Sequence, residues 1–425
     1  MKPLPQYPVS QTKKVCLVMP TLNRYQSARY AAFARGRADT GVFELSGSGS
    51  YDLPDWRSPQ ADKLPNVVTL FPEINLGDIP PRELCATLRT VLAAHREEIG
   101  ALAVMGWEDR AALTALEWAI QQEVPTILMS ESNEFDAARS RVKESLKRRI
   151  VCLFSAGLAG GSAAGSYMEK LGLAKEKILL GYDVVDNTYF ARRGAEVRNQ
   201  SSKMRESHGL PQCFFLASGR LVAKKNLSRL VQAYARYRVL CAKSASQGSP
   251  SQTPWDLVIL GGGPLQEEVR AEASALGLTG CVQMPGAKPY EDLPAFYGLA
   301  SAFVHGSTVE QWGLVVNEAM ASGLPVLVSN RCGCASDLVQ EGINGFTFDP
   351  LDVEQLAGLM HQLTETPKPQ LTRMSSASRE IVRRWSPEVF AENLWKAVQI
   401  AISKPRPQAG WIDRLLLCGL LNLRR

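Results

Sequence analysis

Two acidic residues flank a short helical stretch in the segment EQWGLVVNEAMASGLPVLVSNRCG, which begins at Glu310. Glu318 follows Glu310 after seven intervening residues, and Gly313 stands between them in a turn. Residues 314–322 carry the pattern of a helix, which a Gly-Leu-Pro sequence ends. Because eight helical residues rise by roughly 12 Å, the two carboxylates cannot bind one atom, but they can bind opposite ends of a long polar ligand.

The start of that predicted helix lies between the two acids. The first backbone N–H groups of a helix have no partner within it, and the helix dipole places partial positive charge at the same end. Such an end suits a phosphate group. A ligand with hydroxyls at both ends and phosphate in the middle is a nucleotide sugar, and this is the ligand that the segment indicates.

Two cations occur in a loop nearer the middle of the chain. Arg220 and Lys225 follow a predicted strand and precede a predicted helix. Arginine offers a planar fork of N–H donors and lysine a point charge, so the pair could neutralise a diphosphate leaving group. On spacing alone, an ordinary pair of surface cations explains the same two residues.

A run of glycines follows another strand of the same half. Gly261-Gly262-Gly263-Pro264 is not a Walker loop, because no Gly-Lys-Ser or Gly-Lys-Thr follows it. A tight turn that lets a strand and a helix pack is the simpler explanation. Each of these features is common alone, and their order along one half of the chain is what favours a ligand site.

The composition is that of a globular protein with more than one domain. The chain has 425 residues, of which 45% are hydrophobic and 21% charged, and it is too long for a single core. The net charge of +6 does not indicate a nucleic-acid partner. Nine cysteines without metal or redox spacing favour a reducing compartment. With neither a membrane-spanning run nor the apolar core of a signal peptide, the sequence predicts a cytoplasmic location.

Short apolar runs alternate with helical patterns along the chain, as expected for parallel sheets covered by helices. The expected strands of the first half are 15–19, 67–71, 101–105, 126–129 and 150–154. Those of the second half are 213–217, 255–260, 281–284, 302–304 and 326–328. Residues 44–65 are rich in Gly, Ser, Pro and Asp, so we expect a loop there.

The alternation predicts an α/β fold with two doubly wound domains. The first spans residues 1–190, a polar linker spans 191–212, and the second domain spans 213–385. A long helix and an amphipathic tail occupy 386–425.

Ligands of doubly wound sheets bind beyond the carboxyl ends of the strands. In the first domain Asn23, Ser130 and Glu131 come directly after strands. We therefore expect these three residues on the acceptor side of the ligand site.

Four segments of the second half resemble one known family. They are SGRLVAKKNLSRLVQA, WDLVILGGGPLQEEV, VQMPGAKPYEDLPAFYGLASAFVHGS and EQWGLVVNEAMASGLPVLVS. Together they resemble the donor-binding half of glycosyltransferase family 4, also called glycosyl transferases group 1. The resemblance is strong over 213–385 and weaker over 1–190. It implies a GT-B fold, with two facing Rossmann-like domains and a C-terminal crossover helix.

The resemblance also implies a reaction. A hexose passes from a nucleotide sugar, UDP- or GDP-linked, to a hydroxyl acceptor with retention of configuration and without a metal or other cofactor. Arg220 and Lys225 match the residues that contact the donor diphosphate, and Glu310 matches the acid beside the transferred sugar.

Four further positions match donor-binding residues of the family. Glu318 matches the acid that takes the ribose hydroxyls, and Gly313 and Leu314 match residues whose backbone N–H groups bind phosphate. Gly286 lies in the strand end that borders the base.

Some positions depart from the family pattern. Ser130-Glu131-Ser132 stands where many members carry a histidine near the sugar. The acceptor, which could be a glycan, a lipid-linked sugar or a small molecule, therefore stays open. His305 fits a packed structural histidine as well as a contact to the sugar.

Two other functions also fit the sequence. One is a sugar-nucleotide epimerase on the same fold, and the other is a non-catalytic subunit that binds a nucleotide sugar.

Two segments have the composition of membrane-surface elements. The run from Arg139 to Arg149 carries six positive charges and one negative charge. The tail 410–425 is apolar with flanking arginines. Either could contact the inner face of a membrane, and either could be an ordinary part of the protein surface.

Overall fold

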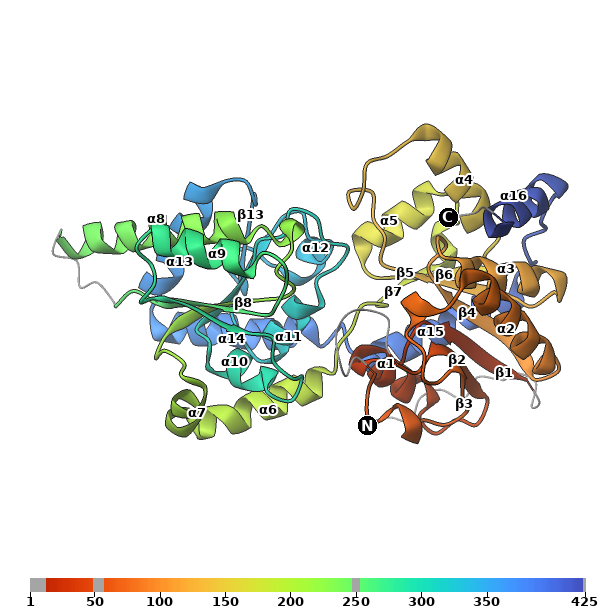
Figure 1. Cartoon of the computed structure of the whole chain (residues 1–425), viewed down its shortest axis with the longest axis horizontal. Helices are drawn as coiled ribbons and strands as arrows, with labels where there is room; N and C mark the ends of the chain where they lie inside the picture. Colours follow the sequence, from red (N-terminus) through yellow and green to blue (C-terminus); the bar gives the residue numbers. More distant parts are fainter. Residues whose placement is uncertain (1–12, 49–56, 247–252, 423–425) are drawn as a thin grey trace. The chain divides into compact units, whose positions relative to one another are not determined.

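The computed structural model describes residues 13–48, 57–246 and 253–422, and it divides into two compact units (Figure 1). Unit 1 comprises Met1–Glu134, Ala138–Val185 and Ser386–Arg425. Unit 2 comprises Phe135–Ala137 and Asp186–Trp385. The chain thus returns to unit 1 for its last helices, as predicted.

Unit 1 contains a seven-stranded parallel sheet with the order β3-β2-β1-β4-β5-β6-β7. The order reverses between β1 and β4, which creates a switch point at the carboxyl ends of these two strands. The strands are β1 (Lys14–Met19), β2 (Thr40–Ser46), β3 (Val67–Phe71), β4 (Ile99–Met105), β5 (Thr126–Ser130), β6 (Ala156–Ala159) and β7 (Ile178–Leu180).

Helices cover both faces of this sheet (Figure 1). They are α1 (Arg24–Ala34), α2 (Pro81–Ala94), α3 (Arg110–Gln121), α4 (Arg141–Val151), α5 (Ser162–Lys170), α15 (Pro387–Ser403) and α16 (Trp411–Asn422). Helix α15 packs against α1, where the rings of Phe33 and Trp395 stack with centroids 4.6 Å apart. This stacking anchors the C-terminal segment to unit 1.

Unit 2 contains a six-stranded parallel sheet with the order β10-β9-β8-β11-β12-β13. Its switch point lies between β8 and β11. The strands are β8 (Phe214–Ser218), β9 (Asp256–Leu260), β10 (Val282–Gly286), β11 (Ala302–His305), β12 (Val326–Ser329) and β13 (Gly345–Phe348).

The helices of unit 2 enclose a core of its own, separate from that of unit 1. They are α6 (Asn187–Asn199), α7 (Ser201–His208), α8 (Leu227–Ser246), α9 (Gln266–Ala275), α10 (Leu293–Leu299), α11 (Leu314–Ala321), α12 (Ala335–Leu338), α13 (Val353–Glu365) and α14 (Lys368–Val382). Within the described residues, no helix is both long and apolar enough to cross a membrane.

The predicted linker is wrong in position. Residues 191–212 continue helix α6 and form α7, both within unit 2, and the chain crosses between units at Val185 and again at Trp385. Helix α6 buries only Phe190, Gly194 and Val197 along its length. In sequence, a helix with so few apolar residues is difficult to distinguish from a polar linker.

A strand was missed at Thr40–Ser46, part of which falls in the predicted loop. All seven residues are buried, including Glu44. The Glu44 carboxylate accepts hydrogen bonds from the backbone of Leu22, from Thr69 and from Arg57, at 2.7–3.2 Å. Because these partners satisfy the carboxylate, a charged residue can occupy a buried strand.

The strand predicted at 150–154 is also wrong. Ile150 and Val151 form the last turn of α4, and the strand begins at Ala156. Both residues are buried, because an amphipathic helix has turned its apolar side to the core. A short apolar run does not by itself distinguish that arrangement from a strand.

Candidate active site

Two loops meet at the switch point of unit 2. Residues 219–226 follow β8, and residues 306–313 follow β11, the neighbouring strand. Carboxyl ends of neighbouring parallel strands share one edge of a sheet, so side chains of the two loops can converge there.

The glycine run shapes the first of these loops. A Cβ atom on Gly261 would lie 2.0 Å from the carbonyl oxygen of Gly219, and one on Gly263 would lie 2.6 Å from that of Leu221. The backbone N–H of Leu221 donates to Gly262 at 2.9 Å. The glycine run therefore lets the loop after β9 pack backbone to backbone against the loop after β8. This role is similar to the tight turn that the sequence suggested.

Lys225 is held by its neighbour Asn226. Asn226 has a left-handed backbone with φ of 56°, and its side chain donates to the carbonyls of Gly306 (3.2 Å) and Pro350 (2.7 Å). The backbone N–H of Thr308 donates to Lys224 at 2.8 Å. These bonds tie the two loops together and fix where the Lys225 ammonium reaches.

The side chains converge on one oxygen of Glu310. Lys225 forms an ion pair with Glu310 Oε2. His305 Nε2 lies 3.2 Å from the same oxygen, and the Ser307 hydroxyl donates to it at 3.1 Å. Lys225 and Glu310 keep 15% and 13% of their side chains exposed, whereas His305 and Ser307 are buried. The cluster is thus open to a ligand on the Lys225–Glu310 side.

The backbone around Glu310 is fixed as well. Gly333 donates to the Glu310 carbonyl at 3.0 Å, and Glu310 forms an isolated parallel bridge with Cys332. Gly313 has φ of 113°, a conformation that L side chains rarely adopt. A Cβ on Gly313 would lie 3.6 Å from Glu310 Cγ and 3.7 Å from His305 Nε2.

Burial and charge act against each other in this cluster. Burial opposes ionisation of Glu310, but the hydrogen bond from His305 and the Lys225 ammonium outweigh it, so the pKa of Glu310 lies well below its usual 4.5. For His305, burial lowers the pKa below 6.5. At neutral pH the imidazole is therefore neutral, and because a carboxylate only accepts hydrogen bonds, Nε2 must carry the proton.

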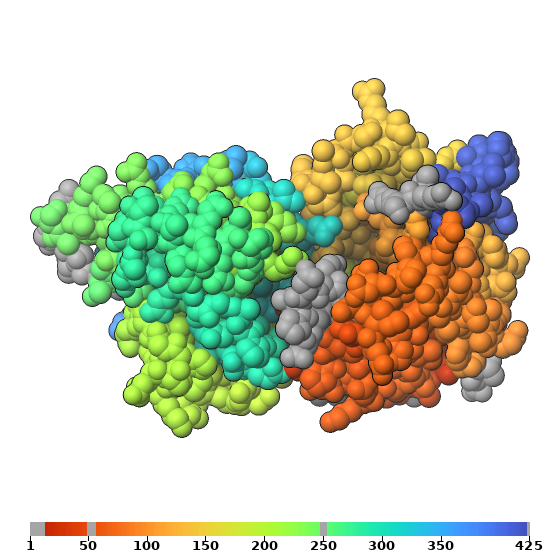
Figure 2. Space-filling view, in the orientation of Figure 1, coloured from red at the N-terminus to blue at the C-terminus, as the bar shows by residue number. Residues whose placement is uncertain are grey.

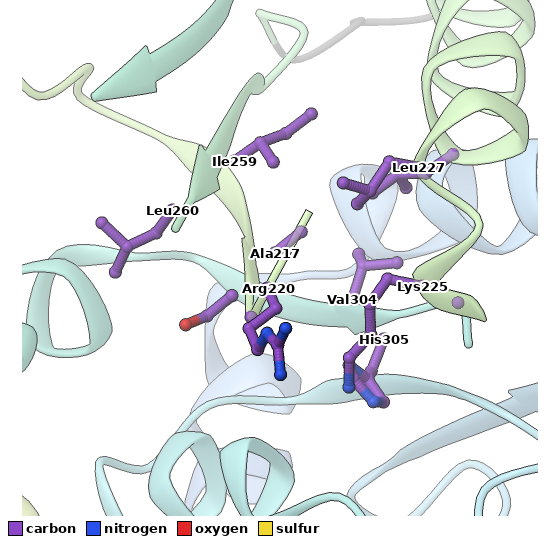
Figure 3. A pocket seen from close by; sticks show the side chains of 12 residues that line it. Ala217, Arg220, Lys225, Leu227, Ile259, Leu260, Val304 and His305 are labelled. Carbon is purple, nitrogen blue, oxygen red and sulfur yellow. The ribbon is translucent and has the colours of Figure 1, made fainter. Parts of the chain in front are cut away.

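Arg220 lies beside this cluster and lines a small pocket. Lys225 and His305 line the same pocket, and the strand residues Ile259 and Val304 form its apolar wall (Figure 3). The structure thus brings together the three predicted catalytic residues, since Glu310 contacts Lys225 directly. The neutral imidazole of His305 and the hydroxyl of Ser307 complete the cluster. Ser307 was not among the predicted site residues, although its position in the sequence, between the strand that ends at His305 and Glu310, could have indicated it.

The predicted donor-binding residues are less closely grouped. Gly313 and Leu314 start helix α11 next to Glu310. Glu318 lies farther along α11, is 1% exposed and accepts a hydrogen bond from Tyr297 at 2.7 Å. Gly286 ends β10, and its carbonyl accepts from Gly261 at 3.1 Å. The structure thus places Gly286 in contact with the glycine run and pairs Glu318 with Tyr297, and the role of these residues toward a donor stays a prediction.

The three acceptor-side candidates lie in unit 1. Asn23 caps helix α1, because its side-chain oxygen accepts from the N–H groups of Tyr25 (3.0 Å) and Gln26 (2.9 Å). Ser130 is buried at the end of β5, and Glu131 follows it, partly exposed. Asn23 therefore has a structural task of its own, and the role of all three toward an acceptor stays a prediction.

Within the described part of the chain, no three His, Cys, Asp or Glu residues are grouped as a metal site. All nine cysteines are free thiols.

Comparison with known families decides what this cluster belongs to. Residues 200–381 match the family Glycosyl transferases group 1. Unit 2 is a glycosyltransferase domain of that family. The family assignment made from the sequence motifs is therefore confirmed.

Curated relatives of this domain are named as glycosyltransferases. The GDP-mannose-dependent alpha-(1-6)-phosphatidylinositol monomannoside mannosyltransferase of Mycolicibacterium smegmatis is 31% identical over 175 residues, which are 39% of this chain and 43% of that protein. The chain thus spans less than half the length of this relative. The amylovoran biosynthesis glycosyltransferase AmsK of Erwinia amylovora is 23% identical over 79% of this chain and 80% of its own.

The solved structures extend the likeness to both units. HepE of Anabaena, in complex with UDP, has a TM-score of 0.68 at 18% identity and covers 91% of this chain and 99% of its own. The same protein has also been solved with UDP-glucose, with a TM-score of 0.67. This likeness confirms the GT-B fold, with two Rossmann-like domains built on parallel sheets.

Proposed function

We propose that this protein is a retaining glycosyltransferase that moves a hexose from a nucleotide sugar to a hydroxyl acceptor. The observation that carries the proposal is the Lys225–Glu310 ion pair beside Arg220, in a domain of the glycosyl transferases group 1 family. This cluster sets two cations and an ionised acid at a strand end where a diphosphate can bind.

In the proposed reaction the bond between the sugar carbon C1 and the diphosphate oxygen breaks, and its electron pair goes to the phosphate. The acceptor oxygen attacks C1 from the same face, and its proton passes to the departing phosphate oxygen. Arg220 and Lys225 stabilise the negative charge that grows on the diphosphate. Glu310, kept ionised by its low pKa, lies beside C1 and stabilises the positive charge that develops there.

Binding of the donor changes the partners of Lys225. In the structure the Lys225 ammonium forms an ion pair with Glu310. A bound diphosphate offers it a second anion, and Lys225 then bridges the acid and the leaving group. His305 and Ser307 continue to hold Glu310 in place.

We propose that the remaining donor contacts follow the family pattern. Glu318 takes the ribose hydroxyls, Gly313 and Leu314 donate backbone N–H groups to phosphate, and Gly286 borders the base. Both UDP- and GDP-linked donors fit the proposal, because one similar structure contains UDP and one relative is named as GDP-mannose-dependent. Because Arg220 and Lys225 supply positive charge, the proposed reaction needs no metal. The proposed location is the cytoplasm, which agrees with the nine free thiols.

The proposal is tested by the Glu310→Gln variant. Release of nucleoside diphosphate from a panel of UDP- and GDP-sugars, with hydroxyl acceptors present, should fall by orders of magnitude, while donor affinity in a thermal-shift assay is largely kept. Glu354→Gln is the matched control, because Glu354 is 68% exposed in the same unit. Near-normal turnover in Glu310→Gln would contradict the role of Glu310.

Two further readouts distinguish the alternatives. An epimerase converts the donor without an acceptor, whereas the proposed enzyme releases diphosphate only when an acceptor is present. The anomeric configuration of the product, read by NMR, should equal that of the donor. Inversion would refute the retaining mechanism, and a purified chain without any turnover would favour a binding subunit.

A further inference from the structure

Helix α16 uses one apolar face to attach to unit 1. Leu417 is 2% exposed and belongs to the core of the unit. Leu416, Leu420 and Leu421 are partly buried and pack against that core. The tail thus docks on the surface of its own protein, which is one of the two alternatives that the sequence left open.

The same helix has a second apolar face that points to solvent. Trp411, Ile412 and Leu415 are 72%, 42% and 63% exposed. Residues 411 and 415 are one helical turn apart, and Cys418 and Gly419 continue the stripe on the same side, both exposed. Docking on unit 1 therefore leaves an apolar stripe uncovered.

Helix α4 carries exposed cations on its outer side. Arg141 and Arg148, two helical turns apart on the same side, are exposed, and among the described residues neither of them is paired with a carboxylate. Two apolar side chains lie among them, Val142 at 69% and Leu146 at 36% exposure. The outer side of α4 is therefore both basic and partly apolar.

The two helices are adjacent in space, although more than 250 residues of sequence separate them. Arg149 on α4 forms an ion pair with Asp413 on α16, with 2.6 Å between nitrogen and oxygen. Figures 1 and 2 show the two helices on the same side of unit 1. The second carboxylate of these helices, Glu144, accepts hydrogen bonds from Tyr167 at 2.8–3.0 Å. Both acids are thus engaged, and the exposed charge is positive.

We propose that the outer sides of α4 and α16 form one surface, the α4–α16 surface, that binds an anionic lipid bilayer. Unpaired cations attract anionic headgroups. Tryptophan and leucine side chains at 72% and 63% exposure enter the boundary between headgroups and acyl chains. An anionic bilayer therefore matches both the positive charge and the exposed apolar side chains of the α4–α16 surface.

A second copy of the chain is the rival occupant, and charge argues against it. A two-fold interface places the same patch on both partners. Pairing through the α4–α16 surface would bring Arg141 and Arg148 of each copy toward the same cations of the other copy. Like charges brought together weaken an interface, whereas an anionic bilayer satisfies them.

The proposal does not depend on the donor site, because the surface belongs to unit 1 and the donor cluster to unit 2. Its test is flotation of the full chain with vesicles of phosphatidylcholine alone, and with vesicles that also contain phosphatidylglycerol. We expect the protein to float with the anionic vesicles and to stay behind with the neutral ones. High salt should weaken the binding, because it screens the charges.

Two sets of variants separate the contributions to binding. Replacing Arg141 and Arg148 by Gln should lower partition to anionic vesicles at least about tenfold. The control replaces Arg383 and Arg384 of unit 2 by Gln; it removes the same charge from exposed positions elsewhere and should bind like the wild type.

The apolar part is tested by the double variant Trp411→Ser, Leu415→Ser. Its control is Val239→Ser, Leu351→Ser, two exposed positions of unit 2 at 47% and 46%. These point variants are preferable to deleting the tail, because deletion would remove Leu417 from the core. Thermal unfolding should show all variants folded.

Three results would overturn the proposal. One is equal partition of the wild type into anionic and neutral vesicles, or no partition into either. Another is equal binding by the α4–α16 variants and their controls. The last is a concentration-dependent dimer in solution that Trp411→Ser, Leu415→Ser abolishes, since it would assign the stripe to a second copy.

Discussion

Within the site, one carboxylate oxygen receives three partners from two loops. Lys225 supplies the charge, while His305 and Ser307 supply hydrogen bonds from buried positions that a ligand cannot displace. The arrangement holds Glu310 in one orientation before any ligand arrives. Such preorganisation is what electrostatic stabilisation of a transition state requires.

Arg220→Ala and Lys225→Ala should each weaken stabilisation of the diphosphate leaving group by about 2–4 kcal/mol in the transition state. The loss should appear in kcat/KM measured with the preferred donor. Lys224→Ala is the matched control, because Lys224 is the exposed neighbour of Lys225. Wild-type rates in Arg220→Ala or Lys225→Ala would remove the leaving-group role.

At the scale of elements, the end of the unit 1 sheet contains a buried ion pair close to the crossing between units. Arg29 of α1 donates to Asp183 at 3.2 Å and to the carbonyl of Val184 at 3.3 Å, and its guanidinium lies 4.5 Å from the centroid of the Tyr182 ring. Both partners keep only 2% of their side chains exposed. Burial raises the pKa of Asp183 to about 6, against the lowering effect of Arg29.

Arg29→Ala should destabilise unit 1 by about 3 kcal/mol, because it leaves a buried carboxylate without its partner. Arg35→Ala, at the residue that follows helix α1, is the control. Its ion pair with Glu388 is about half exposed, so the loss should be below about 1 kcal/mol. Thermal unfolding measures both.

The pH dependence of this effect has a definite sign. The folded pKa of Asp183 lies above its usual 3.8, so between these values the native state binds more protons than the unfolded state, and the stability that this group contributes falls as pH rises toward about 6. Without Arg29 the folded pKa rises further. The penalty of Arg29→Ala should therefore be smaller at mildly acid pH than at mildly alkaline pH, and a penalty that grows on acidification would contradict this account.

At the scale of the whole molecule, two separate cores allow a ligand to stabilise one unit alone. The donor cluster belongs to unit 2, and the outer surface of α4 and α16 belongs to unit 1. Chemistry at the donor and attachment to a bilayer are thus assigned to different units and can be altered independently.

Saturating nucleoside diphosphate should raise the melting temperature of unit 2. At about a hundred times Kd the gain is about 2.7 kcal/mol, which corresponds to roughly 5–10 °C for a unit of this size. The transition of unit 1 should stay where it is. Calorimetry with UDP and GDP in turn would also identify the base, and a shift confined to unit 1 would place the nucleotide elsewhere.

Much of this molecule could be predicted from the order of its residues. A polar loop after each apolar strand, repeated along the chain, indicates a doubly wound sheet, and such sheets present strand ends to ligands. The order of the cation pair and the acid pair along one half of the chain, together with the resemblance to a known family, singled out Arg220, Lys225 and Glu310 as site residues. Gly313 was chosen on the resemblance as well, as a donor of a backbone N–H group to phosphate.

Only the tertiary structure decided which of these residues meet. The pairing of Lys225 with Glu310 depends on β8 lying next to β11, and on Asn226 tying their loops together. Strand order is a long-range property that local patterns do not encode. The contact between Glu318 and Tyr297 and the capping of helix α1 by Asn23 depend in the same way on packing, because buried polar side chains need hydrogen-bond partners.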